Sequence, residues 1–177
     1  MKISSDNPYL KQIEIVLPRL LSLFDQNQIS KTLGIGDRIF WGWKTIDFAN
    51  ANYQGIMHGL ALIAKHNICP FNLDKKIIVK RIVNMINSIH KIIHKNGSLD
   101  EAFPYENSFC VTSLVAYDLL STIEILENDL SEQQIETAKN ISHDLIKFII
   151  KNDENHGIIS NHLATAVAAL FKYHKLI

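Results

Sequence analysis

Asn161 and His162 are neighbouring side chains that could act together on the carboxylate of an acidic sugar. The pair stands where an apolar helix is expected to begin, and the free backbone N–H groups and the dipole of a helix start favour an anion. Asn161 could donate a hydrogen bond to that anion, and His162, which titrates near neutral pH, could assist proton removal. A structural interpretation stays open, because asparagine is a strong N-cap and histidine is tolerated in a first turn.

Three carboxylates lie close together before another expected helix. Asp100, Glu101 and Glu106 share one loop, and Asp100 and Glu106 could serve as the acid and base of a glycoside hydrolysis. Carboxylates are also common before helices, because they favour the positive end of the helix dipole. The cluster therefore has a structural explanation as well as a catalytic one.

A third group of candidates lies in the segment DRIFWGWKTIDF, residues 37–48. Alternate residues of an extended loop point the same way, so the indoles of Trp41 and Trp43 could form a platform for a sugar ring. They could equally close one end of a helical stack, since large aromatic residues are usually well buried. The charged residues of the same loop could contact a ligand or pair with one another; they are Asp37, Arg38, Lys44 and Asp47.

Metal and cofactor chemistry is not indicated. His90 and His94 are four residues apart on an expected helix and could share a metal, but such a site needs three or four convergent ligands and no third one is placed nearby. We expect the pair to be exposed. The sequence has no Gly-rich phosphate loop, G-x-S-x-G elbow or HExxH motif, so we expect neither a cofactor nor a metal.

A repeated unit must position these candidates. Asn52, Asn107 and Asn161 lie 55 and 54 residues apart, and each opens a segment of small and apolar residues at helical spacing. A period of this length indicates a repeat architecture. We expect one all-α domain over residues 1–177, and if its hairpins stack in parallel, the loops before the three asparagines make one surface. The three expected helical hairpins cover residues 6–67, 72–127 and 131–176.

The hairpins predict six helices. The first begins near Asp6 or Asn7 with Pro8 in its first turn, and Pro18 should kink or divide it. No run alternates with period two, so we expect no sheet beyond a short ribbon within residues 35–43. The other helices are expected from Phe48 or Asn50 to His66, from Asp74 to Lys95, from Asn107 to Glu127, from a capping box of Ser131 and Gln134 onward, and from Asn161 to His174.

These helices are of two kinds. The third and fifth are amphipathic and rich in lysine, whereas the second, fourth and sixth are apolar nearly all round and rich in small residues, which is typical of buried helices with close neighbours. We therefore expect the even helices to be inner and the odd helices outer. Gly55 and Gly59 each disfavour a helix by about 1 kcal/mol, so we expect both to pack tightly against neighbouring helices.

Composition excludes several classes of protein. With 18 basic and 18 acidic residues, the chain lacks the charge footprint of a nucleic-acid or anionic-membrane binder. Cys69 and Cys110 lack the spacing of a disulfide framework or a zinc site. No apolar stretch approaches the roughly 18 residues that span a bilayer, and residues 1–21 lack a signal-peptide core. We expect a cytoplasmic protein that contacts neither nucleic acid nor membrane.

Two segments resemble a known family. NGSLDEAFPYENSFCVTSLVAYDLL, residues 96–120, resembles a GS-x-DE-x-x-P-x-E-x-SF pattern of α/α toroid proteins related to the heparinase II/III and alginate lyase group. SNHLATAVAAL resembles that group's Asn-His motif. The resemblance, which covers most of the chain from about Asp37, implies a toroid of alternating inner and outer helices and polysaccharide lyase activity. It also implies that Asn161 and His162 engage a uronate carboxylate, whereas the family's catalytic tyrosine has no counterpart before Ile177.

Two functions remain open. The first is a carbohydrate-active protein, lyase-like or hydrolase-like, that binds an acidic or amino-sugar polymer and uses His162, Asn161, Glu106 or Asp100 in catalysis. The second is a non-catalytic half toroid that completes its fold by homodimerisation or with a partner chain, because an end after three hairpins leaves inner-helix surface exposed. Sugar contacts in the first are expected from Trp41, Trp43, Arg38, Lys44, Asp47, Asn52, Glu101, Tyr105 and Asn107.

Overall fold

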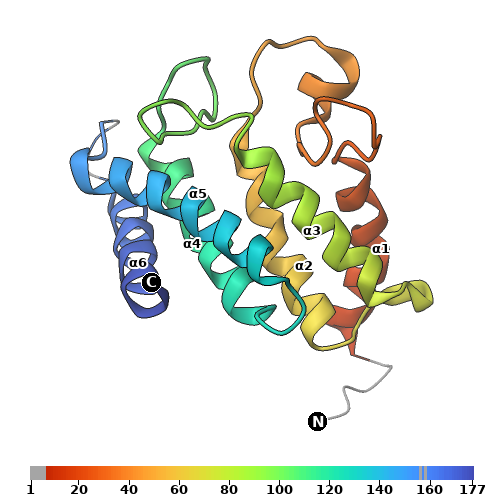
Figure 1. Cartoon of the computed structure of the whole chain (residues 1–177). Coiled ribbons are helices and arrows are strands. Elements are labelled where there is room, and N and C mark those ends of the chain that lie inside the picture. Colours follow the sequence, from red (N-terminus) through yellow and green to blue (C-terminus); the bar gives the residue numbers. More distant parts are fainter. Residues whose placement is uncertain (1–6, 156, 158) are drawn as a thin grey trace.

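The computed structural model describes residues 7–155, 157 and 159–177, and it confirms the all-α prediction (Figure 1). Within these residues the one β feature is an isolated bridge between Leu99 and Ser108. The π-helical turn η1 replaces the ribbon expected within residues 35–43. The elements in chain order are α1 (Pro8–Ser22), η1 (Ile39–Trp43), η2 (Ala51–Gly55), α2 (Ile56–Lys65), η3 (Pro70–Asn72), α3 (Lys75–Ile89), α4 (Phe109–Ile125), α5 (Glu132–Lys151) and α6 (Ser160–Leu176).

Two layers of helices enclose one apolar core. Helices α2, α4 and α6 pack side by side, with α4 in the centre, and α3 and α5 cover them as a second layer. No residue of helix α4 is exposed, and Val111, Val115 and Leu119 are fully buried, as expected of a helix that is apolar all round. Helix α1 lies at the edge of the bundle beside η3. Helices α2, α4 and α6 thus lie in one layer and α3 and α5 in the other. The expectation that α6 is a buried inner helix is wrong, because Ala166 and Ala169 are its buried residues and Val167 and Phe171 are exposed.

Two of the predicted helix starts are confirmed in detail. The Asn7 side chain accepts a hydrogen bond from the Tyr9 N–H with Pro8 in the first turn, and Ser131 and Gln134 form the reciprocal capping box. The prediction that Pro18 divides the first helix is wrong, since α1 continues through it. Asp6, the other expected start of this helix, lies outside the described residues.

The third helix ends earlier than predicted. Helix α3 stops at Ile89 instead of Lys95, and the chain turns there because the N–H groups of Ile92 and Ile93 both donate to the Ile89 carbonyl. Gly97 then packs against α5: its φ is +88°, and a Cβ there would lie 2.2 Å from the Asp144 carbonyl oxygen. The prediction placed the helix end too late because isoleucines recur at helical spacing beyond Ile89, up to Ile93.

The three repeated asparagines do not cap helices. Asn52 lies inside η2, which Asn50 caps; Asn107 precedes the true cap, Ser108; and Asn161 is the second residue of α6. The capping interpretation was wrong, because a neighbouring residue holds the extended backbone that a cap requires. The asparagines therefore recur near the starts of α2, α4 and α6, but they do not share a structural role, since each makes different contacts.

Gly55 and Gly59 also differ. Gly55 packs closely against α4, whereas nothing lies within 4 Å of the position that a Cβ on Gly59 would take. Tight packing was therefore predicted correctly for Gly55 and wrongly for Gly59.

The loops gather at one end of the bundle, drawn at the top of Figure 1 and called the loop end below. It comprises residues 23–50, 90–107 and 152–155. The start of η2, directly after the first segment, is bonded to the second: the Ala51 N–H donates to the Asp100 carbonyl at 3.0 Å, and Asn52 Nδ2 donates to Glu101 Oε1 at 3.1 Å. Among the described residues no helix is long and apolar enough to cross a membrane.

Candidate functional site

A cleft of about 280 Å³ opens at the loop end between residues 40–49, 91–94 and 100–105. Aromatic and charged side chains from all three segments meet in it. This mixture of apolar faces and a few convergent polar groups is typical of a small-molecule site. The lining residues are Phe40, Asp47, Phe48, Ala49, Lys91, Ile92, Ile93, His94, Asp100, Pro104 and Tyr105.

Asp100 holds one wall of this cleft in place. Its buried carboxylate accepts the N–H of Asn107 through Oδ1 and that of Tyr105 through Oδ2, at 3.1 and 2.9 Å. Tyr105 and Asn107 both have positive φ, which costs energy for residues with a Cβ. The two hydrogen bonds offset that cost, so Asp100 fixes the turn that presents Tyr105.

Glu106 and Glu101 stabilise the same loop. Glu106 Oε2 accepts the N–H groups of Glu101, Ala102 and Phe103, between 2.8 and 3.4 Å. Glu101 accepts the Asn52 amide through Oε1 and the Ser108 hydroxyl through Oε2. All three carboxylates therefore have the structural role that was one of the two alternatives for this cluster; the other was catalysis.

His94 lies against Asp100 inside the cleft. Its Nε2 is 2.9 Å from Asp100 Oδ2. Nε2 is buried and lacks a hydrogen bond of good geometry, so the contact is defined by distance and is an ion pair when the imidazole is protonated. The His94 ring also lies 5.6 Å from the Tyr105 ring, centroid to centroid. The expectation that His94 sits exposed on a helix beside His90 is wrong, because α3 ends before both.

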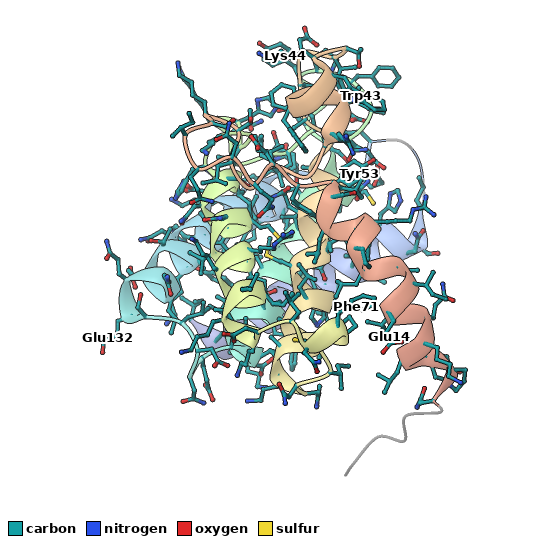
Figure 2. All side chains as sticks on the ribbon, turned by 90° about the vertical axis from the view of Figure 1, so that its right-hand side faces the viewer. Glu14, Trp43, Lys44, Tyr53, Phe71 and Glu132 are labelled. Atoms are coloured by element: carbon teal, nitrogen blue, oxygen red, sulfur yellow. The ribbon has the colours of Figure 1, made fainter. Side chains whose placement is uncertain are left out.

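The two tryptophans differ: one is half-buried and the other is exposed. The Trp41 indole N–H donates to the Leu23 carbonyl at 2.7 Å, so Trp41 ties residues 37–50 to the end of α1. Trp43 is 64% exposed at the tip of the loop end, and the Arg38 guanidinium lies 5.7 Å from its ring centroid (Figure 2). Neither indole lines the cleft. Trp41 is a packing residue, and Trp43 remains available to a ligand.

The charged residues of this loop differ in how they are bound. Asp37 is buried and accepts the N–H groups of Ile39, Phe40 and Asn50, so it fixes η1. Lys44 is exposed beside Trp43 with a positive φ (Figure 2). Asp47 is exposed at the cleft, where its carboxylate has no hydrogen bond or ion pair within the described residues.

Asn161 and His162 lie at the start of α6, outside the cleft lining. His162 Nδ1 is 2.5 Å from Oε2 of Glu154, whose side chain is almost fully buried. This pair anchors residues 152–155 to α6. Asn161 is exposed, and its carbonyl accepts the Thr165 hydroxyl. The structure therefore separates the Asn-His pair from the aromatic residues at the cleft.

The other repeated asparagines tie the loops together. Asn52 donates to Glu101, while Asn107 accepts from Asn96 and Ser98 and donates to the Tyr105 carbonyl. Both therefore position the wall that carries Tyr105.

Cys110 is the thiol at the loop end. Burial, together with the nearby carboxylates of Glu101 and Glu154, raises the pKa of the thiol. A raised pKa keeps the thiol protonated, so Cys110 is a poor nucleophile. Within the described residues no group of three or more histidine, cysteine, aspartate or glutamate side chains could hold a metal ion.

Sequence patterns missed several cleft residues. Phe40, Phe48 and Lys91 carry no local signal of function, and they converge only because three loops meet. His94 was noted for its spacing from His90, although its real partner, Asp100, lies six residues on. Comparison of the chain with protein-family models, with curated proteins and with solved structures finds no match.

Proposed function

We propose that the protein binds a carbohydrate in the cleft at the loop end. The observation that carries the proposal is the convergence of Phe40, Phe48 and Tyr105 with polar side chains from three loops. Aromatic faces suit the apolar faces of sugar rings, and a few fixed polar groups can select among hydroxyl, amine and carboxylate substituents. At about 280 Å³ the cleft suits one or two rings of an oligosaccharide.

The wider fold proposal is a half ring of the α/α toroid kind, similar to the heparinase II/III and alginate lyase group. The layer of α2, α4 and α6 under α3 and α5 supports it. In the proposed arrangement the loops at one end present the ligand site, as the sequence pattern suggested. A cytoplasmic location belongs to the same proposal.

The contacts of the candidate catalytic groups favour binding over turnover. Asp100 and Glu106, the proposed acid and base, already accept backbone N–H groups. His162 contacts the buried Glu154. A lyase or glycosidase reaction would have to use these groups while they keep the loops in shape.

The test is a calorimetric titration of the full chain with acidic, neutral and amino-sugar tetrasaccharides, beside ultraviolet lyase and reducing-end assays. We expect at least one sugar to bind and Tyr105→Asn to weaken it, because asparagine tolerates positive φ but lacks the ring. Phe71→Asn is the matched control: Phe71 also has positive φ and is exposed, but it lies away from the loop end (Figure 2). Absence of binding to every sugar would refute the proposal.

A second candidate function is self-association through α6. One face of this helix packs on α4 through Ala166 and Ala169, whereas Leu163, Val167 and Phe171 form an exposed stripe. Val167 is 65% exposed and Phe171 72%. The stripe is symmetric about Val167, so an antiparallel second copy would place Leu163 of each chain against Phe171 of the other, as a two-fold interface requires.

Light scattering after size exclusion tests this candidate across a range of protein concentrations. We expect a dimer that Phe171→Glu converts to a monomer. Ile29→Glu is the control, because Ile29 is 92% exposed and lies on the loop between α1 and η1. A monomer at every concentration would reject association through α6 and leave the cleft proposal untouched.

A further inference from the structure

The charges around the cleft are unequally compensated. Besides Tyr105, four side chains that line it can be charged near neutral pH: Asp47, Lys91, His94 and Asp100. Asp100 accepts two backbone N–H groups, and its Oδ2 lies 2.9 Å from His94 Nε2. Its negative charge is therefore bound within the protein.

Lys91, which lines the cleft, forms its hydrogen bond with a residue outside the cleft lining. Lys91 Nζ donates to the Leu33 carbonyl at 3.3 Å. Its charge also helps to lower the pKa of Asp25, which lies outside the cleft lining. The ammonium of Lys91 is thus bound by a residue of the segment before η1, outside the cleft lining. Lys91 keeps its positive charge, but the cleft lining holds two carboxylates against this one ammonium, so its charge balance favours a cationic sugar over an anionic one.

Asp47 is the cleft group whose charge lacks a partner in the described part of the chain. It lies next to Phe48 in sequence, and both line the cleft with Phe40 and Tyr105. A carboxylate beside aromatic faces suits a cation, because the carboxylate pairs with the positive charge and the negative ring faces attract it. A uronate carboxylate would instead meet Asp47 as a like charge.

We propose that the cleft selects sugars that carry a free, protonated amine, with Asp47 as the counter-ion and Phe40, Phe48 and Tyr105 as the ring contacts. This inference rests on the proposed function and narrows its ligand from carbohydrate in general to amino sugars. It gives Asp47 the selective role and leaves Asp100 and His94 to shape the wall. The aromatic faces favour a ring-bearing cation over a linear polyamine.

The experiment compares four probes by calorimetry at one low salt concentration: a glucosamine tetramer, its fully N-acetylated counterpart, a guluronate tetramer and spermidine. We expect the glucosamine tetramer to bind at least about tenfold more tightly than the acetylated one, since a charged hydrogen bond is among the stronger polar contacts. The preference should shrink with added salt.

Two matched variants test whether Asp47 causes the preference for the glucosamine tetramer. Asp47→Asn should reduce glucosamine binding to the level of the acetylated tetramer and leave the latter unchanged. Glu14→Gln removes the same charge from an exposed position on α1, away from the loop end (Figure 2), and should change nothing. Among the residues that the structure describes, the Asp47 carboxylate makes no hydrogen bond or ion pair, so equal thermal unfolding of the variants should accompany these results.

Other outcomes separate the two proposals. Equal or tighter binding of the acetylated or guluronate tetramer would overturn the amino-sugar assignment while carbohydrate binding stood. Spermidine binding as tight as glucosamine would show charge recognition without a sugar ring and would also overturn the assignment. Failure of all three sugars would refute both the inference and the function on which it rests.

Discussion

The Asp118 carboxylate on α4 lies against Gly55 at the start of α2, and a Cβ on Gly55 would be 2.5 Å from Asp118 Oδ2. The other oxygen, Oδ1, is 3.0 Å from His58 Nδ1. The His58 ring in turn meets the Tyr117 ring edge to face. Two neighbouring helices are thus joined by a polar contact that has room only because residue 55 lacks a side chain.

Gly55→Ala should destabilise the protein by about 1–2 kcal/mol. The new methyl group displaces the carboxylate from His58, and the cost of that charged contact exceeds the gain in helix propensity. Urea unfolding measures the change. In an Asp118→Ala background the same substitution should cost nothing; an equal cost in both backgrounds would contradict the steric explanation.

Gly59→Ala should have the opposite effect and stabilise the protein by about 0.5–1 kcal/mol. The position is exposed within α2 and has open space around it, so alanine gains helix propensity without a clash. The same urea titration checks it. A destabilised Gly59→Ala variant would mean that something not present in the monomer packs against this face.

Asp118→Asn should stabilise the protein at neutral pH. Burial raises the pKa of Asp118 above its usual value of 3.8, against the opposing effect of His58. The folded state therefore holds the proton more tightly than the unfolded state, so ionised Asp118 costs stability as pH rises through its raised pKa. The advantage of the variant should shrink below pH 4. A variant that is less stable at pH 7 than wild type would show that the bond to His58 outweighs burial.

Glu124 should contribute to acid sensitivity. Hydrogen bonds from Lys172 and Lys175 lower the pKa of Glu124 to about 2, from the ordinary 4.5. Its stabilisation is present above pH 4.5 and is lost as pH falls toward 2. Because the carboxylate is partly exposed, we expect Glu124→Gln to cost less than about 1 kcal/mol at pH 6. Unfolding curves of wild type and variant should converge near pH 2; parallel curves down to that pH would contradict the assignment.

Gln54→Ala should be among the most harmful single changes at the loop end. The buried Gln54 side chain accepts the Gly36 N–H and donates to the Gly34 and Met85 carbonyls and to the Ser88 hydroxyl. Each buried group left without a partner costs about 1–3 kcal/mol. Thermal unfolding should show a loss of several degrees. Gln26→Ala, which removes a single side-chain bond to the Phe24 carbonyl, is the mild comparison.

Helix position was predictable wherever a local signal was complete. The capping box of Ser131 and Gln134 and the Asn7-Pro8 start each specify a helix end within four residues, and both are confirmed. The end of α3 was mispredicted because its isoleucine stripe continues beyond Ile89. The local pattern does not mark the helix end at Ile89, and the residues beyond it make contacts between distant segments, such as Gly97 against α5.

The site was less predictable than the fold for the same reason. Asp47, Asp100 and Tyr105 were chosen for residue type and do line the cleft. His94 was assigned the wrong partner, and Phe40 and Phe48 were not chosen, because only the meeting of three loops gives them a role. Gln54 gave no signal, although its four hydrogen bonds join the segment at Gly34 and Gly36 to the end of α3.

The backbone bonds that Asp100 and Glu106 make have a thermodynamic consequence for ligand binding. These bonds fix residues 100–107 when the chain folds, so the ligand that we propose would not have to order them. Ordering a flexible segment costs roughly 1–2 kcal/mol per residue in conformational entropy. A cleft whose wall is fixed in advance avoids that loss, and even a ligand with few contacts can therefore be held with useful affinity.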